Sequence, residues 1–287
     1  MVFNWLLLRL RGRFFPIDSP NHRSLHTGEI PRTGGGAVLL SVLLFVVLNR
    51  ELRGGVYFVM VLPGLMILAV VSFWDDVKEL SALPRLGVQV MVASIYLLGV
   101  GWTFDHELDV LIALVICIVW SINLYNFMDG MDGLAGTMAV IGFGTFSLIG
   151  YLAGESFFAG FMAVIVCSTA GFLVFNLPPA RIFMGDVGST FLGYIMATAS
   201  LWGIDRGIFP FWVPLLVFLP FWLDATLTLL RRLARGERVW EAHCSHFYQR
   251  AVLSGMTVRK VLFIEVVFML TCAILAISGW FLWVSGR

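Results

Sequence analysis

Long apolar stretches separated by short polar segments dominate the pattern of this chain. Nine of them reach or approach the roughly 20 residues that an α-helix needs to cross a bilayer: 36–49, 56–74, 86–101, 108–124, 134–152, 157–175, 189–203, 209–230 and 261–284. Membrane-spanning barrel strands would be about half as long and would alternate polar with apolar positions. The pattern therefore predicts an all-α, polytopic membrane helix bundle with about nine full transmembrane helices.

The segment before the first predicted span is less apolar. MVFNWLLLRLRGR has too few apolar residues before Arg9 to cross a bilayer, and it has no small-residue cleavage site typical of a signal peptide. We interpret residues 1–35 as a partial N-terminal helix and the first polar loop. A long basic loop is expected at 231–258, and the whole of 1–287 is expected to form one integral membrane domain.

Composition supports the membrane assignment. The chain is 59% hydrophobic and only 13% charged, whereas about a quarter of the residues are charged in an average soluble domain. The net charge of +1 says little about partners, because it averages over two faces of the membrane. The four cysteines show no spacing typical of a disulfide framework.

Lysine and arginine are concentrated in alternate polar segments. Fifteen of the nineteen lie in one set of segments, and the exceptions are Arg50, Arg53, Arg206 and Arg287. Cytoplasmic loops carry an excess of basic residues. The sequence therefore predicts that the richer side is cytoplasmic and that the C-terminus lies outside.

Five unusual polar clusters fall on this same side. They are DSPNHRSLHTGEIPRTGG (18–35), WDDVKEL (74–80), NLYNFMDGMDG (123–133), FNLPPARIFMGDVGST (175–190) and the segment from DATLTLL to HCSHFYQR (224–250). Polar residues that only solvate loops would be expected on both faces. The distribution predicts one working face, with the chemistry in its cytoplasmic loops.

The cluster at 123–133 has a helical spacing. Its four amide and carboxylate side chains are three residues apart, so they would line one stripe if the preceding helix continued this far: Asn123, Asn126, Asp129 and Asp132. Such a stripe inside a largely apolar chain needs a partner.

Two further acidic sites lie at predicted helix ends. Asp75 and Asp76 end a span, and two carboxylates about 4 Å apart repel by roughly 4 kcal/mol at an effective dielectric of 20. A metal ion or a basic neighbour such as Lys78 or Arg85 would relieve this repulsion, although a solvated helix end remains an equal explanation.

Asp186 lies between two glycines, just before the next span, with Arg181 close in sequence. Glycines allow close backbone approach, and the free amides of a helix start attract anions, so GDVGST suits a metal-bridged diphosphate. For these six residues alone, however, an ordinary glycine-flanked helix N-cap is the favoured explanation.

The basic segments offer cations at both ends of the chain. Arg23 and Arg32 lie in the first loop, before three glycines that would let the next helix start tightly against a neighbour. In the last loop, HCSH places His243 and His246 three residues apart, and we prefer phosphate binding to zinc because no other ligands complete a tetrahedral set. Asp224 is expected to pair with Arg231 or Arg232, or to act functionally.

Together these residues indicate a reaction type. Carboxylates and amides without thiolates favour Mg²⁺, or Mn²⁺, over zinc or copper, and Arg and His are usual partners of phosphate oxygens. Such a site at the edge of a membrane span is suited to phosphoryl transfer between a soluble nucleotide and a lipid. A secondary transporter would place its charges near the bilayer midplane instead, in paired repeats.

The motifs DSPNHRSLH, PRTGG, DDVKEL, NLYNFMDGMDGLA, FNLPPARIFMGDVGSTFLG and HCSHFYQR occur in this order from 18 to 250. Together they resemble the polyprenyl-phosphate N-acetylhexosamine-1-phosphate transferases of the glycosyltransferase 4 family, which includes the WecA, TagO and MraY types. The match is closest to bacterial enzymes that start O-antigen or surface-polysaccharide units, because the last motif lacks the MraY type of histidine run. The MraY-type peptidoglycan precursor transferase is the alternative within the family.

The resemblance implies that undecaprenyl phosphate receives a sugar 1-phosphate from a UDP-N-acetylhexosamine, releasing UMP, at the cytoplasmic face of the bacterial inner membrane. It implies a Mg²⁺ site at Asp186 and Asn126, and catalytic roles for Asp75, Asp76 and Asp186. The remaining site residues would bind substrates: Asn123, Asp129, Asp132, Arg181, His243, His246, Arg250, Arg23 and Arg32. The sugar stays open, as does the choice between direct attack and a covalent aspartyl intermediate, although direct attack is favoured.

Membrane lipids are expected partners, nucleic acid is not, and a homodimer is left open. The chain departs from the family pattern at Glu79, Arg85 and Cys244, where many relatives carry Asp, Lys and Arg. Cys244 lacks the guanidinium that an arginine would supply at this position, and this difference could alter binding of the sugar or phosphate.

Overall fold

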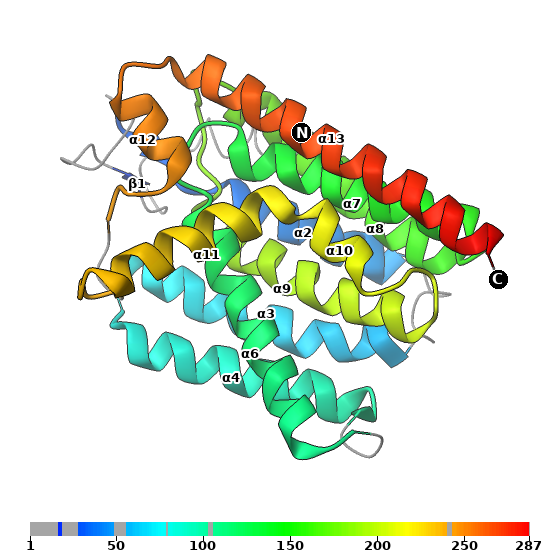
Figure 1. Cartoon of the computed structure of the whole chain (residues 1–287). Coiled ribbons are helices and arrows are strands. Elements are labelled where there is room, and N and C mark those ends of the chain that lie inside the picture. The colour runs from blue at the N-terminus through cyan, green and yellow to red at the C-terminus, as the bar shows by residue number, and fades with distance from the viewer. Residues whose placement is uncertain are drawn as a thin grey trace.

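The computed structural model describes residues 17–18, 28–48, 56–78, 80–102, 106–239 and 243–286. Almost all of its regular structure is helical, apart from two short strands (Figure 1). The elements are β1 (Ile17–Asp18), β2 (Ile30–Pro31), α2 (Gly34–Leu48), α3 (Val56–Lys78), α4 (Ala82–Gly99), α6 (Leu108–Phe127), α7 (Leu134–Leu152), α8 (Ser156–Asn176), α9 (Gly185–Asp205), α10 (Trp212–Val217), α11 (Leu219–Ala234), α12 (Phe247–Leu253) and α13 (Val258–Ser285).

The predicted all-α polytopic membrane bundle is confirmed. Within the described ranges, seven helices are long and apolar enough to cross a membrane, namely α3, α4, α6, α7, α8, α9 and α13. Two of the nine predicted spans differ from a full transmembrane helix. The span predicted at 36–49 forms α2, which has only 15 residues. The span predicted at 209–230 is divided into α10 and α11.

Proline chemistry explains the division between α10 and α11. Pro220 lies in the first turn of α11, directly after the junction at Phe218. Proline has no backbone N–H, and its ring clashes with the carbonyl four residues earlier, so a helix cannot continue through it undisturbed. Hydropathy does not register this effect, because every residue around the junction is apolar.

Helix α9 lies in the middle of the bundle (Figure 1), and 83% of its apolar window is buried. Small residues allow this enclosure, as in other membrane bundles. A Cβ atom at Gly193 would come within 2.7 Å of the Ile122 Cα, so the α9 and α6 backbones approach closely there. The polar ends of α6 and α9 are thereby brought together.

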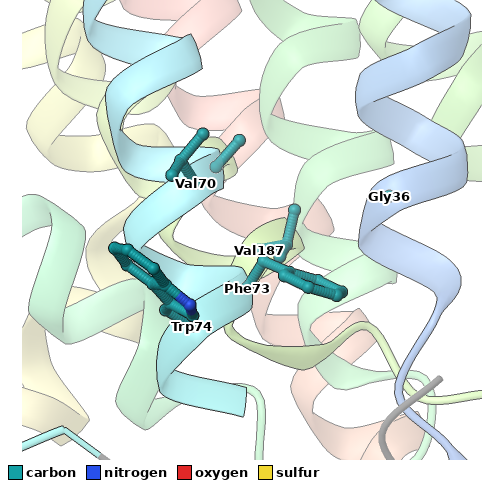
Figure 2. Close-up of a pocket in the computed structure, with 6 residues that line it drawn as sticks. Gly36, Val70, Phe73, Trp74 and Val187 are labelled. Carbon is teal, nitrogen blue, oxygen red and sulfur yellow. The ribbon is translucent and has the colours of Figure 1, made fainter. Parts of the chain in front are cut away.

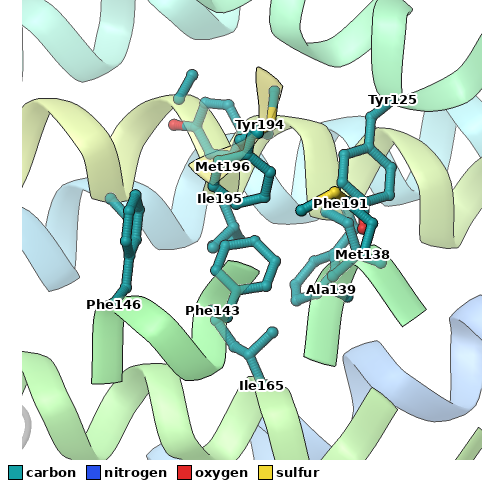
Figure 3. Close-up of a cluster of buried hydrophobic side chains, with 14 of the residues drawn as sticks. Tyr125, Met138, Ala139, Phe143, Phe146, Ile165, Phe191, Tyr194, Ile195 and Met196 are labelled. Atoms are coloured by element: carbon teal, nitrogen blue, oxygen red, sulfur yellow. The ribbon is translucent and has the colours of Figure 1, made fainter. Parts of the chain in front are cut away.

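Aromatic and aliphatic side chains fill the core around α9. Figure 3 shows Tyr125 of α6, Phe143 and Phe146 of α7, and Ile195 of α9 within one cluster. Each of these four side chains is completely buried. The core lies beside the polar residues at the helix ends and holds α6, α7 and α9 in a fixed relation.

Polar segments gather at one end of the bundle, where α12 and β1 lie (Figure 1). The strand pair is antiparallel, with Ile17 opposite Pro31 and Asp18 opposite Ile30. The basic segment predicted as a loop at 231–258 contains the last turn of α11 and all of α12. The partial N-terminal helix predicted at the start of 1–35 lies outside the described residues.

Candidate functional site

The two neighbouring carboxylates at the end of α3 point toward different partners. Asp75 forms an ion pair with Arg85 at 2.5 Å and accepts the Leu80 N–H at 2.8 Å. Asp76 accepts the Asp186 N–H at 3.1 Å and lies 3.5 Å from the Arg32 guanidinium. Successive residues on a helix point in directions about 100° apart. The repulsion expected between the two aspartates is therefore relieved by two separate arginines.

Arg32 reaches Asp76 because the start of α2 is fastened to the start of α9. The Gly34 N–H donates to the Phe183 carbonyl at 2.9 Å, and the Gly35 N–H donates to the Met184 carbonyl at 2.8 Å. Arg32 also forms an ion pair with Asp18 at 2.8 Å. The three glycines were expected to let this helix start tightly against a neighbour, and Gly34 and Gly35 do so.

Asp186 lies where α3, α4, α6 and α9 meet. The Asn126 Nδ2 donates to Asp186 Oδ1 and to Ser189 Oγ, both at 2.9 Å. The other Asp186 oxygen, Oδ2, lies 3.9 Å from the Arg85 guanidinium. The sequence suggested that Asp186 lies just before the next helix. In the structure it belongs to the first turn of α9. Its own N–H already binds Asp76, so this amide is not free to bind an anion.

A small polar cavity of about 20 Å³ adjoins Asp186 and Asn126, which is room for about one water molecule. The Asn123 amide lines it and donates to Gln89 Oε1 at 2.6 Å. The residues around the cavity come from α3, α4, α6 and α9: Leu68, Val71, Ser72, Asp75, Arg85, Val88, Gln89, Asn123, Asn126, Asp186 and Thr190. Both predicted amides thus face the same polar space as Asp75 and Asp186.

The predicted stripe does not extend to Asp129 and Asp132, because α6 ends at Phe127. Gly133, with φ of 79°, forms the turn into α7. Asp132 accepts the Ala180 N–H at 2.9 Å, so this carboxylate holds the 178–182 loop. Burial raises the pKa of the Asp129 carboxyl well above its ordinary value, and the nearby Asp186 charge raises it further. A cation at this position would favour the ionised form.

Asp224 pairs with His246, and the predicted pairing with Arg231 or Arg232 is wrong. Its Oδ1 lies 2.9 Å from His246 Nδ1 and accepts the Phe247 N–H at 3.1 Å, while Oδ2 accepts the Tyr248 N–H at 3.3 Å. The buried Arg232 instead binds Glu237 at 2.9 Å. Asp224 and His246 are on different elements, so no local spacing predicts their contact.

The His246 segment is also joined to the end of α6. Tyr248 Oη donates to the Phe127 carbonyl at 3.0 Å. The rings of His243 and His246 are tilted against each other with centroids 4.9 Å apart. Burial, together with nearby His246 and Arg232, lowers the pKa of His243 to about 4. His243 is therefore a neutral imidazole near pH 7, and an approaching phosphate would favour its protonation.

Three predicted cations are not part of this connected cluster. Arg181 and Arg250 are exposed, and the hydrogen bonds and ion pairs among the described residues do not link either side chain with Asp186. Arg23 lies outside the described residues. Within those residues, no group of three or more His, Cys, Asp or Glu side chains is close enough to hold a metal ion. A cation at Asp186 would need amide, water or substrate oxygens to complete its ligands.

Comparison with known proteins places the chain in a family. The model of glycosyl transferase family 4 matches residues 58–204, about half of the chain. The chain belongs to glycosyl transferase family 4. The matched part of this family 4 protein contains Asp75, Asp76, Asn126 and Asp186, whereas Arg32 and His246 lie outside it.

Three curated relatives extend the similarity over nearly the whole family 4 chain. A Bacillus subtilis protein named as a probable undecaprenyl-phosphate N-acetylglucosaminyl 1-phosphate transferase is 29% identical, over 99% of this chain and 84% of its own. An undecaprenyl-phosphate alpha-N-acetylglucosaminyl 1-phosphate transferase of Yersinia pestis is 27% identical, over 97% and 80%. A decaprenyl-phosphate N-acetylglucosaminephosphotransferase of Mycobacterium leprae is 30% identical, over 88% and 74%. The predicted membership of the polyprenyl-phosphate N-acetylhexosamine-1-phosphate transferase superfamily is confirmed.

Sequence reasoning missed two residues of the candidate site and one that joins the loop after α6 to the loop before α9. Arg85 was noted as a neighbour and a departure but was not included among the site residues, although it contacts Asp75 and approaches Asp186. Gln89 lies one turn further along α4, and a polar residue inside an apolar span is a recognisable sign of function. Asn176, which is buried, accepts the Gly133 N–H at 3.0 Å and donates to the Ile182 carbonyl at 2.9 Å.

Asp224→Ala is expected to lower the stability of this family 4 protein by about 2–4 kcal/mol, because buried donors lose their acceptor. The affected donors are His246 Nδ1 and the Phe247 and Tyr248 amides. The thermal unfolding midpoint of purified protein in detergent measures the effect. Thr228→Val is the control, since it removes only a hydroxyl that donates to Asp224 at 3.2 Å. Equal midpoints for the two variants would contradict the role of Asp224 as a shared acceptor.

Proposed function

We propose that this protein transfers the sugar 1-phosphate of a UDP-N-acetylhexosamine to undecaprenyl phosphate and releases UMP. The observation that carries the proposal is the arrangement around Asp186, which has Arg32 and Asp76 on one side and Arg85 and Asp75 on the other. The reaction would bring two phosphate-bearing substrates close to the Asp186 carboxylate. Cations on both sides of Asp186 are therefore needed to offset the repulsion between these negative charges. The names of the three relatives make UDP-N-acetylglucosamine the first donor to test.

The proposed step exchanges one phosphorus–oxygen bond for another. An oxygen of the lipid phosphate attacks the phosphorus that carries the sugar, and the bond from that phosphorus to the bridging oxygen of UMP breaks. UMP leaves with the electron pair. Positioning and charge neutralisation are the main requirements of phosphoryl transfer. The arginines supply both without a covalent intermediate, which favours direct attack.

The two aspartates of α3 have different parts in this proposal. The Asp76 side chain is only 1% exposed, and it binds the start of α9 and Arg32. It therefore holds Asp186 and Arg32 in place and is a positioning residue. Asp75 lines the polar cavity beside Arg85, which Asp186 and Asn126 also line. If either carboxylate accepts a proton from the lipid phosphate, Asp75 is the better placed.

Mg²⁺ is the proposed cofactor, with Mn²⁺ as a substitute. Asp186 and Asn126 would hold it, because Mg²⁺ commonly uses one or two protein oxygens and completes its shell with water and substrate phosphates. The donor set at Asp186 fits this mode better than an all-protein cage. When bound, the ion would neutralise the charge that develops on the diphosphate.

The proposed setting is the cytoplasmic face of a bacterial inner membrane. Uridine nucleotides are soluble, and the polar end of the bundle carries most of the Lys and Arg residues. The product would be an undecaprenyl-diphosphate sugar, the first lipid-linked unit of an O-antigen or another surface polysaccharide. Membrane lipids remain the expected surroundings, and the homodimer that the sequence left open stays open.

Release of UMP tests the proposal. Purified protein in detergent with undecaprenyl phosphate, UDP-N-acetylglucosamine and Mg²⁺ is expected to release UMP, and EDTA is expected to lower the rate by at least about 10³-fold because the charge on the diphosphate is no longer neutralised. Added Mg²⁺ should restore it. A panel of other UDP-N-acetylhexosamines identifies the preferred donor. If folded protein releases no UMP from any donor, the transferase proposal fails and transport of a phosphorylated solute becomes the alternative.

A further inference from the structure

Helix α3 borders two hollows of opposite character. One is apolar, has a volume of about 320 Å³ and is lined on the α3 side by residues that include Phe73 and Trp74 (Figure 2). The other is the polar cavity of about 20 Å³ beside Asp186, which Ser72 and Asp75 line from the opposite face of the same helix. Buried polar groups need hydrogen-bond partners, so the donors and acceptors around the polar cavity decide what it can hold.

The Asn123 amide is held in one orientation beside this cavity. Its Nδ2 lies 2.8 Å from the Val119 carbonyl, which can only accept, so this contact fixes which end of the amide is the nitrogen. The second N–H donates to Gln89 Oε1 at 2.6 Å. Both amide protons are thereby used. Asn123 has no N–H left for a phosphate oxygen, and it offers the cavity only its acceptor, Oδ1.

Gln89 is left with the opposite kind of group. Its side chain lines the cavity, the residue is only 6% exposed, and its Nε2 has no hydrogen-bond acceptor among the described residues. The neighbouring hydroxyls already use their protons. Thr190 Oγ1 donates to the Asp186 carbonyl at 2.6 Å, so Ser72 Oγ is the donor in its 2.8 Å bond to Thr190. The cavity therefore has an uncharged donor, Gln89 Nε2, close to two acceptors, Asn123 Oδ1 and the Asp186 carboxylate.

We propose that Gln89 is a positioning residue that turns Asn123 Oδ1 toward the cavity, where one water joins Gln89 Nε2, Asn123 Oδ1 and the Asp186 carboxylate. The cavity has room for about one water, and a buried water typically makes about three hydrogen bonds. One bond accepted from Gln89 and two donated to Asn123 and Asp186 give this number. The proposal rests on the proposed transferase function, because Asp186 is the central carboxylate of that reaction.

The water would fix the direction of the Asp186 carboxylate without adding charge. Asn126 already donates to Asp186 Oδ1 at 2.9 Å, and an ionised carboxylate can accept about four hydrogen bonds. A neutral donor on the cavity side leaves the negative charge available to a cation on the substrate side. Without Gln89, the Asn123 amide loses one of its two anchors and the water loses its donor, so Asp186 is held less firmly.

The first test is Gln89→Met. Methionine has a similar length, favours a helix and removes both the strong acceptor and the donor. We expect kcat for UMP release to fall by about tenfold, because slight misplacement of a reacting group is costly. The KM values of both substrates should stay within about twofold, since Gln89 faces a cavity that is too small for either substrate. A purely structural glutamine would lower the thermal unfolding midpoint without changing kcat of the folded protein, and that result would overturn the proposal.

Ser94→Ala is the control on the same helix. The Ser94 hydroxyl is exposed and donates to the Val90 carbonyl at 2.8 Å, within α4 itself. Its removal should leave kcat at the wild-type value.

A double-mutant cycle asks whether Gln89 acts through Asn123. In an Asn123→Ala background, Gln89→Met is expected to change kcat by less than about twofold, because the amide that it positions is already gone. The full tenfold loss in both backgrounds would mean that Gln89 acts independently of Asn123, which would overturn the proposal.

The water can be sought without any activity. A structure of the full wild-type chain, at a resolution that shows ordered water, should contain one water within about 3.2 Å of Gln89 Nε2, Asn123 Oδ1 and an Asp186 carboxylate oxygen. Gln89→Met should lack it. A wild-type cavity without water would overturn the assignment even if UMP is released. A water that is present in the wild type and lost in Gln89→Met, in a protein that releases no UMP, would support the assignment and refute the transferase.

Discussion

Asp186→Asn is expected to reduce UMP release by about 10³-fold or more while leaving the protein folded. The amide has nearly the same shape as the carboxylate, and its oxygen can still accept from Asn126, which donates at 2.9 Å in the native protein. What it lacks is the negative charge needed to hold a divalent cation beside the diphosphate. The measurement is the UMP release assay at saturating substrates, together with the thermal unfolding midpoint.

Asp205→Asn is the matched control for this variant. Asp205 is exposed at the opposite end of the same helix, α9, so the substitution changes the same charge far from the site. It should keep the wild-type rate. An Asp186→Asn protein that retained activity within about tenfold, with normal stability, would show that the essential carboxylate lies elsewhere, and Asp75 would then be the next residue to test.

Gly35→Ala is expected to destabilise the protein by about 1–3 kcal/mol, as overpacking of a close interface commonly does. The new methyl group would lie 2.3 Å from the Gly188 Cα and 2.6 Å from the Met184 carbonyl oxygen, and both are backbone atoms that cannot rotate away. Separation of α2 from α9 would also move Arg32 away from Asp76. We expect UMP release to fall by about 10²-fold, since misplacement by about 1 Å can cost that much.

The thermal unfolding midpoint and the UMP release rate together test the close contact of α2 with α9, with Gly160→Ala as control. Gly160 is an exposed glycine of α8 whose Cβ would meet nothing within 4 Å. Alanine there should stabilise the protein slightly, by about 0.5–1 kcal/mol. If Gly35→Ala and Gly160→Ala had the same midpoint, the close contact of α2 with α9 would be wrong. If Gly35→Ala were less stable but fully active, the position of Arg32 would not depend on the contact of α2 with α9.

The sequence by itself determined the helices and the membrane class, because these depend on the length and hydropathy of local segments. The spans predicted at 134–152 and 157–175 correspond closely to α7 and α8. Motif order alone indicated the family, which the comparisons confirmed. The sequence also identified Asp75, Asp186 and Asn126 as chemically unusual, since charged and amide groups at the ends of apolar spans are costly without a purpose.

Only the tertiary structure decided which of these residues contact one another. Asp224 pairs with His246 across 22 positions, and Asn126 donates to Asp186 across 60. The predicted stripe ended early because α6 ends at Phe127. Two apolar segments predicted as full spans proved to be a short helix and a helix divided near Pro220. A hydropathy pattern records the preference of each residue for lipid or water. It cannot record which helix faces lie together, and both the ion pairs and the polar cavity depend on that packing.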